Sequence, residues 1–273
     1  MSVAVAITVN DGVVLATDSA QMAKDSAGRV NIHYQKRKLF PLHDSLPLGL
    51  ATVGLNRIAG VSVGSLCFDL KQLFSGKMER DGESWKLDPT TYTVKDVVDR
   101  VKEYLFDGFY LPAFDKLPEK SSLTVHVGGV SAGQKFPEFA EMEFLGQHVK
   151  GPNIVNGGTA GHITLSGSAE ACHRLVMGYS PALGSLLEQS GLKSDEVREF
   201  LNKAKAALFP HILDGAMPLA EAADVARFLV DTEIRFSTLT PDPDVVGGDI
   251  QLAVISREHG FKWLSADNGS FLD

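Results

Sequence analysis

The 273-residue sequence contains only two cysteines, too few for a disulfide framework. Its two cysteines, Cys67 and Cys172, lie in apolar, helix-like segments, so two buried free thiols are favoured over one disulfide. None of its eight histidines forms an HxH or HExxH pair, the spacings that direct two imidazoles to one metal ion. We therefore expect no metal and no cofactor.

Basic charge and long apolar runs are also missing. The net charge is −8, and the single short basic run, Lys36 to Lys38, does not offset it, so a nucleic-acid partner is not expected. No run approaches the ~18 apolar residues of a membrane span, and no basic region precedes the first apolar stretch. We therefore expect no membrane association and no signal peptide, and a cytoplasmic location fits the composition.

The composition is otherwise that of an ordinary globular protein, with 44% apolar and 22% charged residues. Two runs rich in β-branched residues, 3–9 and 13–17, flank the turn-forming sequence NDG and predict a β-hairpin at the start of the chain. A strict two-residue turn there pairs Asp18 with Val5, on the face opposite Ser2. The hairpin alone therefore does not predict contact between Ser2 and Asp18.

The rest of the chain alternates between groups of strands and groups of helices. No linker, repeat or low-complexity tract interrupts it, so we expect one domain over residues 1–273. The order favours two antiparallel sheets packed together, with helices on both outer faces, over a parallel α/β fold. Further strands are predicted at 33–42, 48–54, 122–130, 138–145 and 161–166 and in a closing pair after 247; helices are predicted at 57–74, 94–109, 168–189, 194–208 and 218–235, and a surface loop at 75–93.

Four short motifs occur in a recognisable order: DGVVLATDS, KLFPL followed by GLATVG, LSGSAEA, and VGGDIQLAVISREHGFKWL. In order and spacing they resemble the β subunits of the proteasome and their bacterial relative, the HslV peptidase. The resemblance extends from Ser2 to about Leu264. It implies an α+β fold, the four-layer αββα sandwich of the N-terminal nucleophile (Ntn) hydrolases.

The resemblance also implies a catalytic site. The N-terminal nucleophile of the family falls on Ser2, its acidic residue on Asp18 and its lysine on Lys38. The glycine whose N–H helps to bind the oxyanion falls on Gly54, and the serine of the GSG motif falls on Ser168.

The sequence departs from the family pattern in three places. Serine replaces the N-terminal threonine, and Ala169 replaces the last glycine of GSG. The loop with the last acidic residue and a serine is replaced by TPDPDVVGG. Asp244 is the candidate for that acid, and Val246 occupies the position of the serine.

An N-terminal serine carries its own general base. Its α-amine has a pKa near 7.7–8.0 against ~10.4 for lysine, so roughly a sixth of such amines are neutral at pH 7. We therefore expect removal of Met1 to expose Ser2. Lys38 then stays cationic and lowers the pKa of the amine and the hydroxyl, Asp18 fixes Lys38, and Ser168 orients the amine. The Gly54 N–H stabilises the oxyanion, an interaction whose loss typically costs ~10²–10³ in rate.

Each candidate also has a plain structural interpretation. Asp18 could end a strand, Lys38 could belong to a solvated basic run, and Ser168 could cap a helix.

The function that these features favour is a proteasome-like, threonine-type serine peptidase that hydrolyses peptide amide bonds in peptides or unfolded proteins. It would work inside a homo-oligomeric ring, and the resemblance leaves open whether an unfoldase ATPase is a partner. The alternatives are a catalytically inactive structural subunit of such an assembly and an Ntn amidase acting on a small amide.

Overall fold

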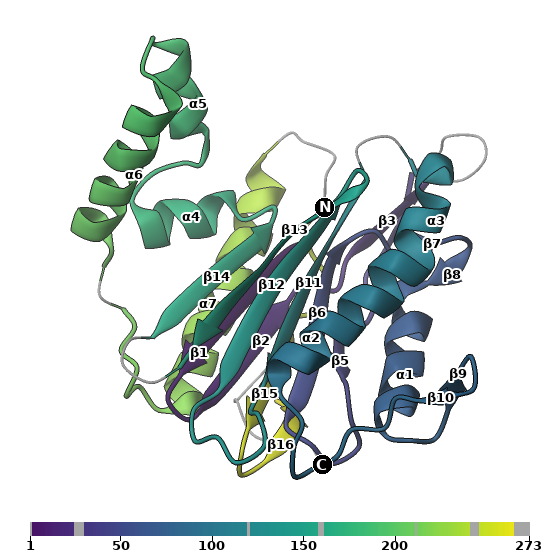
Figure 1. Cartoon of the computed structure of the whole chain (residues 1–273). Coiled ribbons are helices and arrows are strands. Elements are labelled where there is room, and N and C mark those ends of the chain that lie inside the picture. The colour runs from purple at the N-terminus through teal and green to yellow at the C-terminus, as the bar shows by residue number, and fades with distance from the viewer. Residues whose placement is uncertain are drawn as a thin grey trace.

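The computed structural model describes residues 2–24, 30–118, 121–157, 161–210, 212–240 and 246–264. Two five-stranded antiparallel sheets lie at its centre (Figure 1). The first has the order β14 (His162–Gly167), β1 (Val3–Val9), β2 (Gly12–Thr17), β15 (Gln251–Ser256), β16 (Gly260–Trp263). The second has the order β13 (His148–Asn156), β12 (Glu138–Leu145), β11 (Ser122–Gly129), β6 (Leu48–Gly54), β5 (Leu39–Pro41).

The N-terminal hairpin forms as predicted, with a different register. Val9 pairs with Gly12 and Ala4 with Thr17, so Asp18 comes beside Val3 rather than beside Val5. The Asp18 N–H donates to the Val3 carbonyl at 3.4 Å. The start of β1 and the end of β2 are therefore adjacent, and this adjacency brings Asp18 to Ser2.

Apolar side chains fill the space between the two large sheets. This central layer contains Ala6, Val13, Leu15, Leu39, Ala51, Phe139, Ala253 and Ile255. A residue with a larger side chain is excluded at Gly49, because a Cβ atom there would meet the Phe261 ring at 2.5 Å. Close packing fixes how the two sheets sit against each other, and with it the position of β5 relative to β1.

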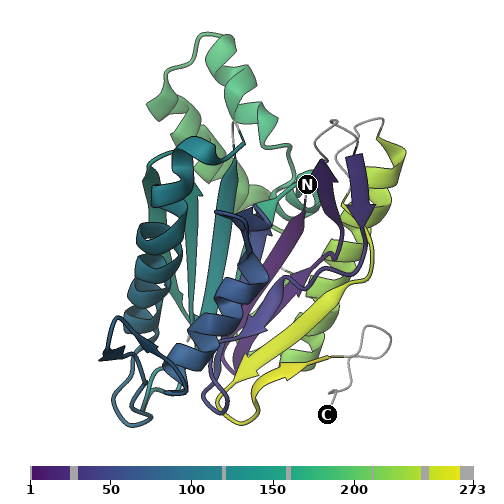
Figure 2. The ribbon, with the colours of Figure 1, turned by 90° about the vertical axis from the view of Figure 1, so that its right-hand side faces the viewer.

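The outer faces of the sheets are covered by different helices. On the first sheet, α7 (Leu219–Leu239) and α4 (Glu170–Met177) bury a second apolar cluster. On the second sheet the cover is α1 (Val63–Phe74), α2 (Val94–Lys102) and the wider helical turns η1 (Glu103–Tyr110). Figure 2 shows α1 and α7 on opposite sides of the strands.

The expected four-layer αββα sandwich is wrong as a description of this chain. The described residues form five antiparallel sheets, because three two-stranded sheets accompany the two large ones. These pair β3 (Gln21–Lys24) with β4 (Val30–His33), β7 (Arg57–Ile58) with β8 (Val61–Ser62), and β9 (Glu79–Arg80) with β10 (Glu83–Ser84). Helices α5 (Ala182–Gln189) and α6 (Ser194–Leu208) project beyond the sheets in both views (Figures 1 and 2). Only Val197 is buried on these two helices, so they do not complete a layer. The fold is α+β with several antiparallel sheets.

Several predicted element boundaries also change. The helix predicted at 168–189 is two helices, because Gly178 takes a left-handed φ of 78° as the C-cap of α4 and Pro181 follows it. The helix predicted at 57–74 begins only at Val63, after the hairpin of β7 and β8. After η1 the chain continues through α3 (Leu111–Ala113) and the turn η2 (Phe114–Lys116). No helix within the described residues has the length and apolar content needed to cross a bilayer.

Candidate active site

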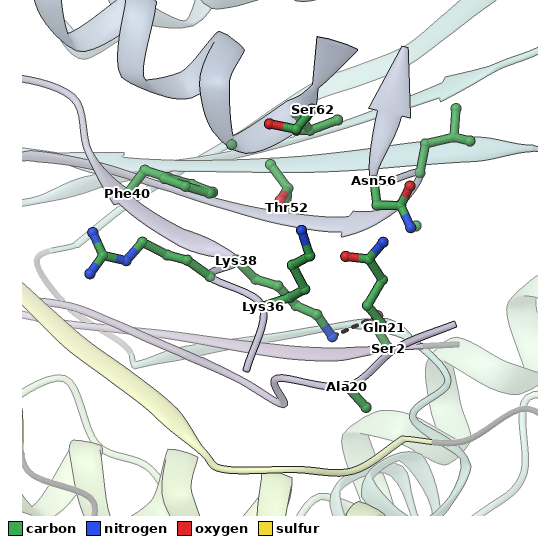
Figure 3. Close-up of a pocket in the computed structure, with 14 residues that line it drawn as sticks. Ser2, Ala20, Gln21, Lys36, Lys38, Phe40, Thr52, Asn56 and Ser62 are labelled. Atoms are coloured by element: carbon green, nitrogen blue, oxygen red, sulfur yellow. Dashed lines mark hydrogen bonds between the residues drawn. The ribbon is translucent and has the colours of Figure 1, made fainter. Parts of the chain in front are cut away.

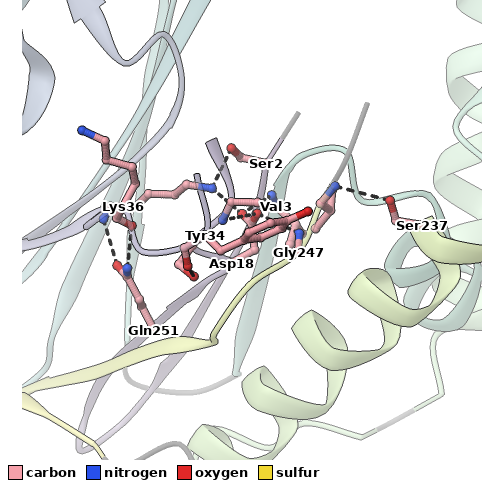
Figure 4. A network of polar contacts seen from close by, with 12 residues as sticks. Ser2, Val3, Asp18, Tyr34, Lys36, Ser237, Gly247 and Gln251 are labelled. Atoms are coloured by element: carbon pink, nitrogen blue, oxygen red, sulfur yellow. Dashed lines mark hydrogen bonds and ion pairs between the residues drawn. The ribbon is translucent and has the colours of Figure 1, made fainter. Parts of the chain in front are cut away.

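Three of the predicted residues meet in one buried cluster. The Lys38 Nζ donates to Ser2 Oγ at 2.8 Å and to Asp18 Oδ1 at 2.6 Å (Figure 4). Ser2 is 8% exposed, Lys38 7% and Asp18 0%. Lys38 is therefore not part of a solvated basic run, and it links the predicted nucleophile to the predicted acid.

Strand geometry brings these three residues together. Ser2 directly precedes β1 and Asp18 directly follows β2, so the hairpin places them at one end of the first sheet. Lys38 directly precedes β5 of the second sheet, and its carbonyl accepts from the Thr52 N–H of β6 at 2.9 Å. The site thus forms where an end of one sheet faces an edge strand of the other.

Asp18 is held by four donors. Besides Lys38, its carboxylate accepts backbone N–H groups of Val3 at 3.1 Å, Ala20 at 3.2 Å and Gly247 at 3.2 Å. An ionised carboxylate only accepts, so this arrangement suits its charged form. Asp18 fixes the position of Lys38 and also connects the ends of β1 and β2 to the segment before β15.

The environment of Lys38 changes its acidity. Burial lowers the pKa of the Lys38 amine, and the charge of Asp18 and its hydrogen bond oppose this effect only in part. Lys38 therefore releases its proton more readily than an exposed lysine does. An ammonium of this kind is suited to donating a hydrogen bond to a serine oxygen that gains negative charge.

Gln251, which the sequence analysis did not select, holds the backbone around Lys38. The Lys38 N–H donates to Gln251 Oε1 at 2.8 Å, and Gln251 Nε2 donates to the Lys36 carbonyl at 2.6 Å (Figure 4). One side-chain amide thus pairs with both backbone groups, as a neighbouring strand would. Gln251 begins β15 and is 213 residues from Lys38, so only the sheet topology brings it there.

Ser168 contacts Ser2 through its backbone. Its N–H donates to the Ser2 carbonyl at 2.8 Å. The preceding Gly167 has a φ of 80°, and a Cβ atom there would lie 2.0 Å from the Ser2 carbonyl oxygen. Ala169 rather than Ser168 is the N-cap of α4, so the capping interpretation of Ser168 fails. The glycine of this motif, which the sequence analysis did not select, permits the close approach that fixes Ser2.

Gly54 and Ser2 line the same pocket, which has a volume of about 250 Å³ (Figure 3). Gly54 has a φ of 104°, and a Cβ atom there would lie 2.3 Å from the Ser122 carbonyl oxygen, so only glycine fits. Ser2 can be reached from this pocket. Its other lining residues are Ala20, Gln21, Lys36, Arg37, Lys38, Phe40, Thr52, Leu55, Asn56, Ser62, Val63 and Gly64.

Asp244 lies outside the described residues, and its expected role stays a prediction. The neighbouring segment that is described reaches the site through Gly247, whose N–H donates to Asp18. Val246 is buried, and its N–H donates to Ser237 Oγ at 3.3 Å. This loop therefore supports Asp18 by a backbone group.

A second serine also contacts a basic side chain. Ser166 Oγ and Glu141 Oε2 lie 2.8 Å and 3.1 Å from the same nitrogen, Nε2, of His126. Ser166 also donates to Glu141. In a catalytic triad the acid and the serine contact opposite ring nitrogens, whereas the other nitrogen of His126 is buried without a partner among the described residues. This cluster lacks the geometry of a triad.

A third serine, Ser62, lies in a GxSxG pattern from Gly60 to Gly64. It is not among the candidates that the sequence analysis selected. In serine hydrolases this spacing places the nucleophile on a strained turn between a strand and a helix. Here Ser62 has unstrained angles, φ −71° and ψ 139°, and its side chain accepts the Ser65 N–H as the N-cap of α1. Ser65 Oγ is its side-chain partner at 2.7 Å. Ser62 is thus a helix cap on the pocket wall.

Metal-binding geometry does not occur in the part of the chain that the structure describes, where no three His, Cys, Asp or Glu side chains gather. Both cysteines are free and buried, as predicted. Burial raises the pKa of each thiol, so neither is a candidate nucleophile.

No protein-family model matches the sequence, and no curated protein matches it. The solved structures that resemble it include a Gly-1 mutant of Anbu from Hyphomicrobium sp. strain MC1. That likeness has a TM-score of 0.52 and 17% identity, and it covers 98% of this chain and 89% of the Anbu chain. At this identity it shows a similar fold and nothing finer.

These comparisons correct the assignment to the proteasome β-subunit and HslV family. Four short motifs in the right order do not amount to a match with any family model. The function of Ser2, Lys38 and Asp18 therefore has to be argued from their geometry.

Proposed function

We propose that this protein is an N-terminal serine amidohydrolase that cleaves peptide amide bonds, with Ser2 as its nucleophile once the Met1–Ser2 bond has been cut. The hydrogen bond from Lys38 to Ser2 Oγ carries the proposal. It holds the oxygen of a nearly buried serine against a cation, beside a pocket that admits a substrate.

The freed α-amine of Ser2 provides the general base. Ser2 Oγ accepts from Lys38, so the hydroxyl proton can pass to the amine while Oγ forms a bond to the substrate carbonyl carbon. In the tetrahedral intermediate the former carbonyl oxygen carries negative charge, and the Gly54 N–H is proposed to stabilise it. The ammonium proton then passes to the leaving nitrogen as the C–N bond breaks.

Water completes the cycle. The acyl group is now an ester of Ser2 Oγ, and the amine removes a proton from water as its oxygen attacks the ester carbonyl. Collapse of the second intermediate releases the acid and returns the proton to Ser2 Oγ. Throughout, Asp18 holds Lys38, and the charge of Lys38 stabilises the partly ionised serine oxygen.

We also propose that copies of the chain assemble into a ring around the site. Large apolar side chains are exposed on three helices: Phe68 on α1, Phe200 on α6 and Phe228 on α7 are 59%, 49% and 56% exposed. Contacts between like subunits would bury such residues. Light scattering tests this, because a ring has several times the 29.4 kDa mass of one chain. A fully active monomer would favour an amidase of small substrates.

N-terminal sequencing combined with a turnover assay tests the proposed function. The active protein should begin at Ser2 and hydrolyse members of a peptide library. A fully active preparation that retains Met1 would contradict the mechanism, since the Ser2 nitrogen is then an amide. A protein that lacks Met1, hydrolyses neither peptides nor small amides and forms no adduct at Ser2 would instead be a structural subunit.

A further inference from the structure

The pocket beside Ser2 has an unusual charge for this protein. The whole chain has a net charge of −8. Nevertheless, the described residues that line the pocket include three cations, Lys36, Arg37 and Lys38, and no aspartate or glutamate. A site of this kind attracts anionic groups and repels cationic ones.

The three cations differ in the groups that already contact them. Lys38 is paired with Asp18. The Arg37 guanidinium lies over the Trp263 ring, 5.2 Å from its centroid. No carboxylate of the described residues forms an ion pair with Lys36 or Arg37. Because the Arg37 guanidinium stacks on Trp263 while the Lys36 side chain stands in the pocket (Figure 3), Lys36 is the cation placed to pair with a ligand.

Lys36 is also held in place. Its N–H donates to the Ser19 carbonyl at 3.1 Å, and its own carbonyl accepts from Gln251 Nε2 at 2.6 Å. Figure 3 shows its side chain standing in the pocket, with the amine directed toward the side formed by Thr52 and Asn56. The backbone of Lys36 is therefore fixed on one wall while its charge faces the space that a substrate would enter.

We propose that Lys36 makes this pocket selective for a carboxylate-bearing side chain, Asp or Glu, on the acyl side of the scissile amide. The inference rests on the proposed function. The acyl half of the substrate becomes bonded to Ser2 Oγ in the first step and remains there until water releases it, so we assign the pocket lined by Ser2 to that half. A volume of about 250 Å³ has room for a side chain of this size, with Phe40 and Val63 against its methylene groups. The amide of Gln21 provides a further hydrogen-bond donor on the wall.

Matched peptide amides that differ only in the residue before the cleaved bond, Glu, Gln or Lys, test this selectivity. The wild-type protein should show a kcat/KM for the Glu substrate about tenfold above that for the Gln substrate, and lowest for the Lys substrate. Lys36→Gln should remove the preference for Glu over Gln. Lys36→Glu should reverse the order of the Glu and Lys substrates. Lys95→Gln is the matched control, because Lys95 lies on α2 outside the pocket and pairs with Asp99.

Binding of the same peptides to a Ser2→Ala variant measures selectivity without turnover. The Glu peptide should bind about tenfold more tightly than the Gln peptide, and the difference should shrink at high salt. Equal binding or equal kcat/KM for Glu and Gln, or a preference that survives Lys36→Gln, would overturn the role of Lys36. If the peptides show a Glu preference in binding, but the wild-type protein neither hydrolyses them nor forms an adduct at Ser2, the selectivity of the pocket would be supported and the amidohydrolase function refuted.

Discussion

Among the described residues, Ser2 and Ser166 each contact a basic side chain in a buried polar cluster, and their hydroxyl groups differ in the direction of the hydrogen bond. Ser2 accepts a hydrogen bond from Lys38, so its own proton remains available to a base. Ser166 donates its proton to Glu141, which therefore holds it in the resting state. A serine beside a base is thus insufficient, since the direction of the hydrogen bond decides what the oxygen can do.

The two clusters also differ in how their surroundings shift the pKa of the charged partner. Burial alone would raise the pKa of the Glu141 carboxyl, but hydrogen bonds from His126 and Ser166 outweigh it and lower this pKa. Glu141 thus keeps its charge and its hold on the Ser166 proton. At the other site, burial lowers the pKa of Lys38 while a hydrogen bond to Asp18 fixes its position. In the Lys38 cluster the serine itself lines a pocket, whereas in the His126 cluster Glu141 lines a pocket and Ser166 is not among the residues that line it.

Substitution of the two serines gives the largest expected difference. Ser2→Ala removes the attacking oxygen and should lower kcat by at least ~10³-fold. Ser166→Ala should leave kcat within about twofold and lower the free energy of unfolding by ~1–2 kcal/mol, because it removes one donor to Glu141. Hydrolysis assays and chemical denaturation check both variants. Loss of turnover in Ser166→Ala with a retained fold would break the comparison.

Substitution of Lys38 separates charge from geometry. Lys38→Ala leaves the Asp18 carboxylate buried without its cation, so activity should fall more than tenfold and stability by ~3 kcal/mol. Lys38→Arg keeps a cation for Asp18, and stability should fall by only ~1 kcal/mol. Its activity should still be poor, because a planar guanidinium does not replace an ammonium between two partners.

A Lys38→Ala protein that keeps more than about a tenth of the wild-type activity, a loss below ~1.4 kcal/mol, would remove Lys38 from the mechanism. Denaturation of each variant alongside the assay shows whether low activity reflects unfolding.

Gln251→Ala should have an intermediate effect. It removes the two hydrogen bonds that Gln251 makes with the segment before β5, so the free energy of unfolding should fall by ~2 kcal/mol and kcat by roughly tenfold through displacement of Lys38. Gln189→Ala, on the exposed end of α5, is the matched control and should change neither quantity. A normal kcat in a folded Gln251→Ala protein would show that β5 positions Lys38 without this clamp.

The smallest effect concerns pH. The pKa of Lys38 is lower in the folded protein than its ordinary value of 10.5. At pH values between these two pKa values, the unfolded chain therefore binds more protons than the folded protein. Stability contributed by this residue should therefore rise with pH through that window. The difference in unfolding free energy between the wild-type protein and Lys38→Met should grow in favour of wild type as the pH rises toward the ordinary lysine value of 10.5. A constant or shrinking difference would mean that the folded protein does not lower this pKa.

The parts of the site that sequence could predict are those fixed by neighbouring residues. Ser2 and Asp18 flank one hairpin and Lys38 precedes a short apolar strand, and the resemblance of the four ordered motifs to a known family selected these three residues. Gln251 and the Gly247 N–H come from the far end of the chain, and only sheet pairing places them there. No residue pattern distinguishes such a glutamine from any other in a strand.

The same contrast between local and long-range determinants applies to the fold. The helix at 194–208 has a clear apolar period and a polar start, and its bounds were predicted correctly. Strand β13 was missed because its sequence, HVKGPNIVN, is polar, exposed and interrupted by glycine and proline. The register of the first hairpin was wrong by two residues, since turn geometry, which the letters NDG do not fix, decides which residues pair.

Covalent labelling of the active protein tests the central claim most directly. The protein is treated with a hydroxyl-reactive peptide inhibitor, and intact mass and peptide mapping then locate the adduct. One inhibitor per chain should be found, on Ser2 of a chain that has lost Met1, and none on Ser62 or Ser166. Stoichiometric labelling of Ser62 or Ser166, or an active protein whose Ser2 stays unlabelled while hydrolysis is blocked, would contradict the assignment of Ser2 as the nucleophile.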